Sequence, residues 1–181
     1  MTQHLHHGGC GCLPPKFSGL SRRGMLGAGF AGAMVAAFPA LAAGGNYEAM
    51  LVNCIDPRFT TSSFTYMAGR GFKDSYSQFV MAGGPIGVVA DAFSDWRKTF
   101  WDNLAITVKL HNIKRVVGVT HRDCGAAAVA YGDRIVSDFG FETQKHTEAL
   151  RAFRAELFQR YPKLTVDTGI MSLDGAVTVV T

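Results

Sequence analysis

Charged side chains are scarce in this sequence, and acidic ones are absent from its first 42 residues. Only 18% of the 181 residues are charged, and Lys16, Arg22 and Arg23 account for most of the formal net charge of +4. The remaining residues hold 15 basic and 14 acidic side chains, so the body lacks the clustered positive charge of a nucleic-acid-binding surface. Apolar residues make up 48%, which excludes a disordered chain and indicates one globular domain.

The leader contains an uncharged stretch, residues 24–45, directly after Arg22 and Arg23. Twin arginines, a mildly apolar region broken by glycines, and the small-x-small sequence at residues 40–42 resemble a twin-arginine export signal. We therefore expect residues 1–42 to be an export leader, cleaved near Ala42, that delivers a folded domain to the periplasm. Two alternatives stay open. One is an uncleaved membrane anchor, because about 20 uncharged residues can cross a bilayer, and the other is a soluble helix.

The four cysteines fall into two pairs that lie far apart in the sequence. Cys10 and Cys12 are too close for an unstrained disulfide, and we expect the His- and Cys-containing residues 4–12 to have no chemical role, with metal chelation as the alternative. Cys54 and Cys124 could form a disulfide in an exported protein. The soft and charged residues beside them favour a metal site instead.

The body of the chain alternates apolar runs with helical patterns. We expect strands at residues 49–55, 78–82, 113–120, 165–173 and 176–180, the last returning as a hairpin. Helices are expected at residues 94–111, with Ser94 as the cap, and at residues 143–161, ending before Pro162. This order predicts an α/β fold in which a mostly parallel central sheet of four to five strands is flanked by helices, in a single domain spanning residues 43–181.

Metal-ligating side chains follow two of these strands, 67 residues apart. Cys54 ends the first strand, His121 ends the third, and Cys124 precedes a short helical segment. Sites in parallel sheets gather at the carboxyl ends of the strands, so the two groups converge if the strands are neighbours. Three N/S ligands with one open position are the ligand count of a catalytic zinc site, which can turn bound water into hydroxide near neutral pH.

Two motifs carry a family resemblance. Cys54-Ile55-Asp56-Pro57-Arg58 and His121-Arg122-Asp123-Cys124 resemble the Cys-x-Asp-x-Arg and His-x-x-Cys motifs of the β-class carbonic anhydrases, and residues 81–84 are similar to that family's Asn-Ala-Gly turn. The resemblance spans residues 47–180. It implies Zn²⁺ bound by Cys54, His121 and Cys124, and reversible hydration of carbon dioxide to bicarbonate by a metal-bound hydroxide.

The same resemblance assigns the catalytic roles. Asp56 would accept a hydrogen bond from the hydroxide and relay a proton. Arg58 would hold Asp56 ionised and away from the metal through a charge-assisted pair, although in some members the aspartate binds the zinc. Gln78 is a candidate for the family's active-site glutamine by position alone. We expect Asp123 to cap the short helix after Cys124.

Further expectations concern the surroundings of the site and its partners. His111 and His146 are expected to be exposed, and the aromatic-rich residues 59–79 either pack or reshape the substrate mouth or an interface. Because few residues separate Ala42 from the first strand, we expect no counterpart of that family's long N-terminal arm. We expect a homodimer or higher oligomer, with membrane contact only if the leader is retained. The alternatives are a hydrolase of carbonyl sulfide or carbon disulfide, and a zinc-holding, non-catalytic subunit of an exported or membrane-attached assembly.

Overall fold

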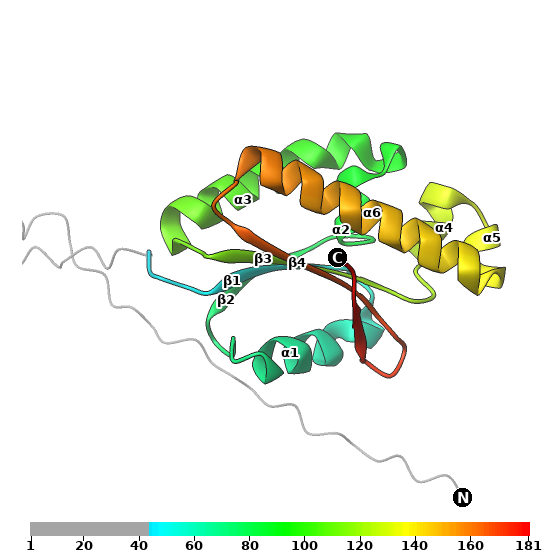
Figure 1. Cartoon of the computed structure of the whole chain (residues 1–181), viewed down its shortest axis with the longest axis horizontal. Coiled ribbons are helices and arrows are strands. Elements are labelled where there is room, and N and C mark those ends of the chain that lie inside the picture. The colour runs from blue at the N-terminus through cyan, green and yellow to red at the C-terminus, as the bar shows by residue number, and fades with distance from the viewer. Residues whose placement is uncertain (1–43) are drawn as a thin grey trace, which may run out of the picture. The chain divides into compact units, whose positions relative to one another are not determined.

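A single sheet organises residues 44–181, the part of the chain that the computed structural model describes (Figure 1). The strands are β1 (Ala49–Asn53), β2 (Tyr76–Val80), β3 (Arg115–His121), β4 (Thr165–Met171) and β5 (Val177–Val179). Their order across the sheet is β2-β1-β3-β4-β5. The first four strands are parallel, and β5 pairs with β4 in the antiparallel sense. The predicted α/β fold with a mostly parallel sheet and a terminal hairpin is confirmed.

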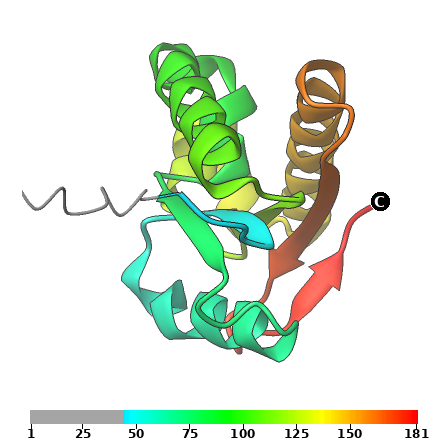
Figure 2. The same cartoon turned by 90° about the vertical axis from the view of Figure 1, so that its left-hand side faces the viewer.

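Helices cover both faces of the sheet. The α-helices are α1 (Thr60–Gly69), α2 (Pro85–Val89), α3 (Arg97–His111), α4 (Gly125–Tyr131), α5 (Arg134–Ser137) and α6 (Phe139–Arg160). Two 3-10 helices, η1 (Pro57–Phe59) and η2 (Asp91–Trp96), precede α1 and α3. Figure 2 shows α1 on one side of the sheet, with α3 and α6 on the other.

Alternation along β1 divides the core into two layers. Met50 and Val52 pack with Phe100 of α3 and Phe153 of α6, while the residues between them face the opposite side. There, Ala49 and Leu51 pack with Phe59 and with Met67 of α1. All five residues of β1 are buried, which is why the strand reads as an almost continuous apolar run.

Both predicted helices exist, but their starts were predicted wrongly. The first begins at Arg97 after the 3-10 turn, and Ser94 does not cap it, because the N-cap position is Trp96 and no side chain bonds there. The second begins at Phe139, four residues early, because the Asp138 side chain accepts a hydrogen bond from the Phe141 N–H at 2.9 Å. An aspartate in that position satisfies one free N–H of the first turn.

The predicted leader, residues 1–42, lies outside the described residues. Within residues 44–181, no helix combines the length and apolar character needed to cross a membrane.

Candidate metal centre

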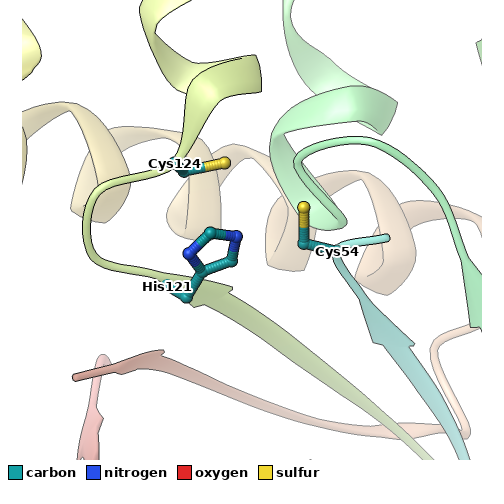
Figure 3. A group of neighbouring side chains, drawn as sticks. All are labelled: Cys54, His121 and Cys124. Carbon is teal, nitrogen blue, oxygen red and sulfur yellow. The ribbon is translucent and has the colours of Figure 1, made fainter. Parts of the chain in front are cut away.

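Two adjacent strands deliver the predicted ligands to one edge of the sheet. β1 and β3 are neighbours, with Val52 opposite Gly118. The two motifs therefore converge, as expected if these strands lie side by side. Cys54 follows the end of β1, and His121 is the last residue of β3. Cys124 lies at the N-cap of α4. Figure 3 shows the three side chains pointing toward one another from these separate elements.

The ligand atoms form a tight, buried cluster. The two sulfur atoms and a ring nitrogen of His121 all lie within 4.8 Å of one another. The residues Cys54, His121 and Cys124 are 8%, 3% and 4% exposed. Both of these cysteines are free thiols in the structure, so the geometry matches the metal-site expectation rather than the alternative of a Cys54–Cys124 disulfide.

His121 is oriented as a metal ligand. Its Nδ1 lies 2.8 Å from the carbonyl oxygen of Arg122, and a carbonyl can only accept, so Nδ1 must carry the proton. Nε2 then holds the free lone pair, and this atom is buried without a hydrogen-bond partner. The ring of Phe59 stacks on the imidazole at 4.1 Å and fixes its plane. A buried acceptor without a partner, oriented through the other ring nitrogen, is the arrangement a metal ion satisfies.

The pKa values of the two thiols are shifted in opposite directions. A hydrogen bond from the Cys124 thiol lowers the pKa of Cys54 to about 4, although burial alone would raise it. His121 and the Gly83 N–H, which lies 3.2 Å from Cys54 Sγ, also lower the pKa of Cys54. The hydrogen bond between the two thiols, together with burial, raises the pKa of Cys124. One thiolate is therefore stabilised before any cation arrives. A divalent cation would displace the proton that the Cys124 thiol donates to Cys54.

The glycine turn after β2 makes the Gly83 contact possible. Gly84 has a φ of +55°, and a Cβ atom there would lie 2.9 Å from the backbone carbon of Asn53. Only glycine tolerates both conditions. The turn residues therefore pack directly against the end of β1, beside Cys54.

Asp56 and Arg58 form the predicted pair at the mouth of the cluster. Arg58 Nη2 donates to Asp56 Oδ2 at 2.7 Å, and Nε donates to both carboxylate oxygens at 3.1 Å. These bonds from the Arg58 side chain lower the pKa of Asp56 to about 2. Asp56 Oδ2 also lies 4.0 Å from His121 Nε2, which places an ionised carboxylate beside the cluster.

Asp123 does not cap α4, contrary to the prediction. α4 begins without a side-chain cap, and Asp123 adopts a positive φ of 56°. Its carboxylate instead accepts a hydrogen bond from Arg58 Nη1 at 2.7 Å. The residue between the second and third ligands is thereby tied to the arginine of the first motif.

Sequence reasoning missed Glu142, a buried acid of α6. Its carboxylate accepts from Arg122 Nη1 at 2.9 Å and from the Asp123 N–H at 2.8 Å. Only the fold brings this helix against the ligand loop, so no local pattern in the sequence marks the residue. Glu142 fixes the segment that joins His121 to Cys124.

A pocket of about 330 Å³ opens beside Cys54 and is lined by Cys54, Ile55, Asp56, Pro57, Ala82, Gly125 and Ala126. A larger, mainly apolar pocket of about 470 Å³ adjoins it and shares Ile55 and Ala82. Gln78 lines neither pocket and instead donates to Asn53 Oδ1 at 3.0 Å from the exposed side of β2. The position of Gln78 therefore gives no support to its expected role as the active-site glutamine.

The expectation that the other two histidines are exposed is wrong, whereas the aromatic segment follows the packing alternative. His146 is fully buried on α6, and His111 is half-buried with Nδ1 2.6 Å from Ser77 Oγ, so neither is exposed. Most of the aromatic segment packs under the sheet around α1: Phe59 is buried and Tyr66, Phe72 and Tyr76 are partly buried against the same cluster. Phe64 is the exception, at 46% exposure.

Fold and site together define the class of protein: an α/β domain that presents a thiol–imidazole–thiol ligand set, open on one side, at the carboxyl edge of a mostly parallel sheet. The model of the family described as "Putative carbonic anhydrase" matches residues 45–166. This chain belongs to that family.

Two uncharacterised bacterial proteins are similar to this chain in sequence, and one solved structure is similar in fold. A protein of Rickettsia bellii is 31% identical over 128 residues, which cover 71% of this chain and 78% of that protein. A protein of Rickettsia conorii is 31% identical over 128 residues, covering 71% of this chain and 69% of that protein. Among solved structures, a carbonic anhydrase from Glaciozyma antarctica shares the fold, with a TM-score of 0.50, 16% identity, and coverage of 79% of this chain and 87% of that one.

Proposed function

We propose that this protein catalyses the reversible hydration of carbon dioxide to bicarbonate at a zinc ion held by Cys54, His121 and Cys124. The observation that carries the proposal is the buried cluster of two thiols and an unpartnered imidazole nitrogen, within 4.8 Å of one another, beside an ionised carboxylate. Bound zinc would supply the nucleophile by lowering the pKa of a water molecule toward neutrality.

The residues of the chain would bind the zinc ion, orient a water molecule and relay a proton. Two thiols and one imidazole suit zinc in ligand type and leave a fourth position open. Asp56 stands at the mouth of the cluster as an acceptor, which orients a water proton and passes it toward solvent. Arg58 occupies the other lone pairs of Asp56 and keeps it ionised. Apolar pocket walls at Ile55 and Ala82 suit a small uncharged substrate.

Metal analysis and stopped-flow hydration on the purified full-length chain test the proposal together. We expect about one zinc per chain, and Cys54→Ser should lose metal and rate together, while Cys10→Ser in the leader keeps both. Asp56→Asn should keep the metal and lose roughly a hundredfold in rate, while the exposed Asp95→Asn stays at the wild-type rate. A wild-type rate for Asp56→Asn would remove its role, and a metal-free, inactive wild type would overturn the proposal.

The same assay distinguishes the alternatives. Carbonyl sulfide and carbon disulfide are tested in parallel, because a linear electrophile of either kind fits the same nucleophile. Inactivity toward all three substrates, with co-purifying partners, would support the zinc-holding subunit instead. The homodimer or higher oligomer stays a prediction; its support is the exposed apolar Val80 on the edge strand β2 with Ile55 nearby, since such edges in soluble proteins are usually covered.

Export by the twin-arginine route also stays a proposal. Its support is the sequence of residues 21–42 alone, and delivery of an already folded protein would let the zinc site assemble before transport.

A further inference from the structure

Arg58 is held from two sides, by carboxylates of both ligand motifs. Its Nε and Nη2 donate to Asp56, while Nη1 donates to Asp123 Oδ2 at 2.7 Å and Nη2 to the Asp123 carbonyl at 3.0 Å. All three nitrogens of the guanidinium are thus used, and its donors have a fixed planar arrangement. Arg58 cannot turn with Asp56 without breaking the contacts to Asp123.

The position of Asp123 is in turn set by α6. Its φ of +56° is uncommon for any residue other than glycine, although Asp and Asn adopt it more readily than most. Glu142 holds this conformation by accepting from the Asp123 N–H at 2.8 Å and from Arg122 Nη1 at 2.9 Å. Glu142 is only 7% exposed, so its two hydrogen bonds are shielded from water, and the surrounding structure determines the strained residue.

We propose that Asp123, held by Glu142, is a positioning residue. It accepts from Arg58 Nη1, the nitrogen that Asp56 does not use, and so keeps Asp56 paired with Arg58 instead of bound to the metal. The inference rests on the proposed metal centre. The Arg58 and Asp56 side chains are 48% and 17% exposed, and a single ion pair with one exposed partner is a weak restraint. Asp56 Oδ2 is already 4.0 Å from His121 Nε2, and a carboxylate is itself a zinc ligand. A second anchor on Arg58 therefore decides which partner Asp56 takes.

Asp123→Asn tests the anchor without changing its shape. Asparagine also tolerates a positive φ, and the main chain still bonds to Glu142 and Arg58, so only the charge is lost. In the cobalt-substituted protein, thiocyanate should bind at the open position and should change the visible spectrum. We expect the variant to keep its metal content and melting temperature, and its thiocyanate affinity to fall about fivefold, because Asp56 now competes for that position.

Two further variants make the result specific. Adding Asp56→Ala to Asp123→Asn should restore thiocyanate affinity, because the competing carboxylate is gone. Asp133→Asn, an exposed aspartate outside this network, should behave as wild type. Wild-type thiocyanate affinity in Asp123→Asn, or no rescue in the double variant, would overturn the anchor while zinc content and hydration still stand. A protein that binds neither zinc nor cobalt would instead overturn the proposed function itself.

Discussion

We expect His146 to make the folding stability of this protein decrease at acidic pH. The residue lies on α6, is completely buried, and neither ring nitrogen has a hydrogen-bond partner. Burial, reinforced by the nearby charges of Arg122 and His121, lowers its pKa to about 4 from an ordinary value of 6.5. The folded protein therefore holds this imidazole neutral at a pH where the unfolded chain protonates it.

The sign and size of the effect follow from this difference. Because the pKa is lower in the folded state, the unfolded state binds the extra proton, and stability falls as pH drops from 6.5 toward 4. Between a pH above 6.5 and a pH below 4, this difference in pKa removes on the order of 3 kcal/mol from the free energy of unfolding. At pH 5 the loss relative to neutral pH is about 2 kcal/mol.

His146→Leu removes the titration and also the two unpartnered polar nitrogens. At pH 7.5 we expect the variant to be at least as stable as the wild type, because leaving a buried polar group unpaired costs about 1–3 kcal/mol. By pH 5 its advantage should grow by about 2 kcal/mol. Urea unfolding at the two pH values, with chelator and reductant present for both proteins, measures the difference.

Subtracting the wild-type stability from the variant stability at each pH removes the titration of groups that both proteins share and that do not interact with His146. His111→Gln is the matched control, because His111 is half-buried and has Ser77 Oγ as a partner. The reasoning is refuted if the stability of His146→Leu falls between pH 7.5 and pH 5 as steeply as that of the wild type.

Two other predictions address the glycine turn and the leader. Gly84→Ala places a side chain at a positive φ, with its Cβ 2.9 Å from Asn53, and should lower the free energy of unfolding in urea by about 2–4 kcal/mol. The control Gly69→Ala, with no atom within 4 Å of the added Cβ, should leave it unchanged. Equal effects of the two substitutions would contradict the close packing of the turn. Replacing Arg22 and Arg23 with lysine should abolish export in a fractionation assay, whereas Lys16→Arg should not; export that survives the double lysine variant would exclude the twin-arginine route.

Much of the fold could be predicted from the sequence because buried parallel strands leave a local signature. β1 and β3 are covered on both faces, so their apolar runs are visible in the sequence. The edge strand β2 has exposed positions and was placed two residues late. α1 was missed because its residues 60–64 are Thr, Thr, Ser, Ser and Phe, which show no apolar stripe at helical spacing.

The ligands of the candidate site could be predicted for the same local reason. Cys54 follows the last residue of β1, His121 ends β3, and Cys124 comes three residues after His121. Asp56 and Arg58 are two residues apart, and their pairing also follows from the motif. Asp123 could not be assigned this way. Whether an aspartate before a helix caps that helix or bonds elsewhere depends on the backbone conformation, and its positive φ directs the carboxylate to Arg58.

The errors that matter most for function lie on α6. Glu142 and His146 are one helical turn apart, and the other polar residues of α6 are exposed or half-buried. A charged residue and a histidine on a helix normally indicate its solvent face. Here the N-terminal part of α6 packs against the ligand loop, where Glu142 finds the Asp123 N–H and Arg122 as partners, while His146 finds none. The burial of Glu142 is compensated by its two hydrogen bonds and by the positive charge of Arg122. The burial of His146 is tolerated only in the neutral form. The support of the metal centre therefore depends on long-range packing of one helix, which strand-end motifs do not encode.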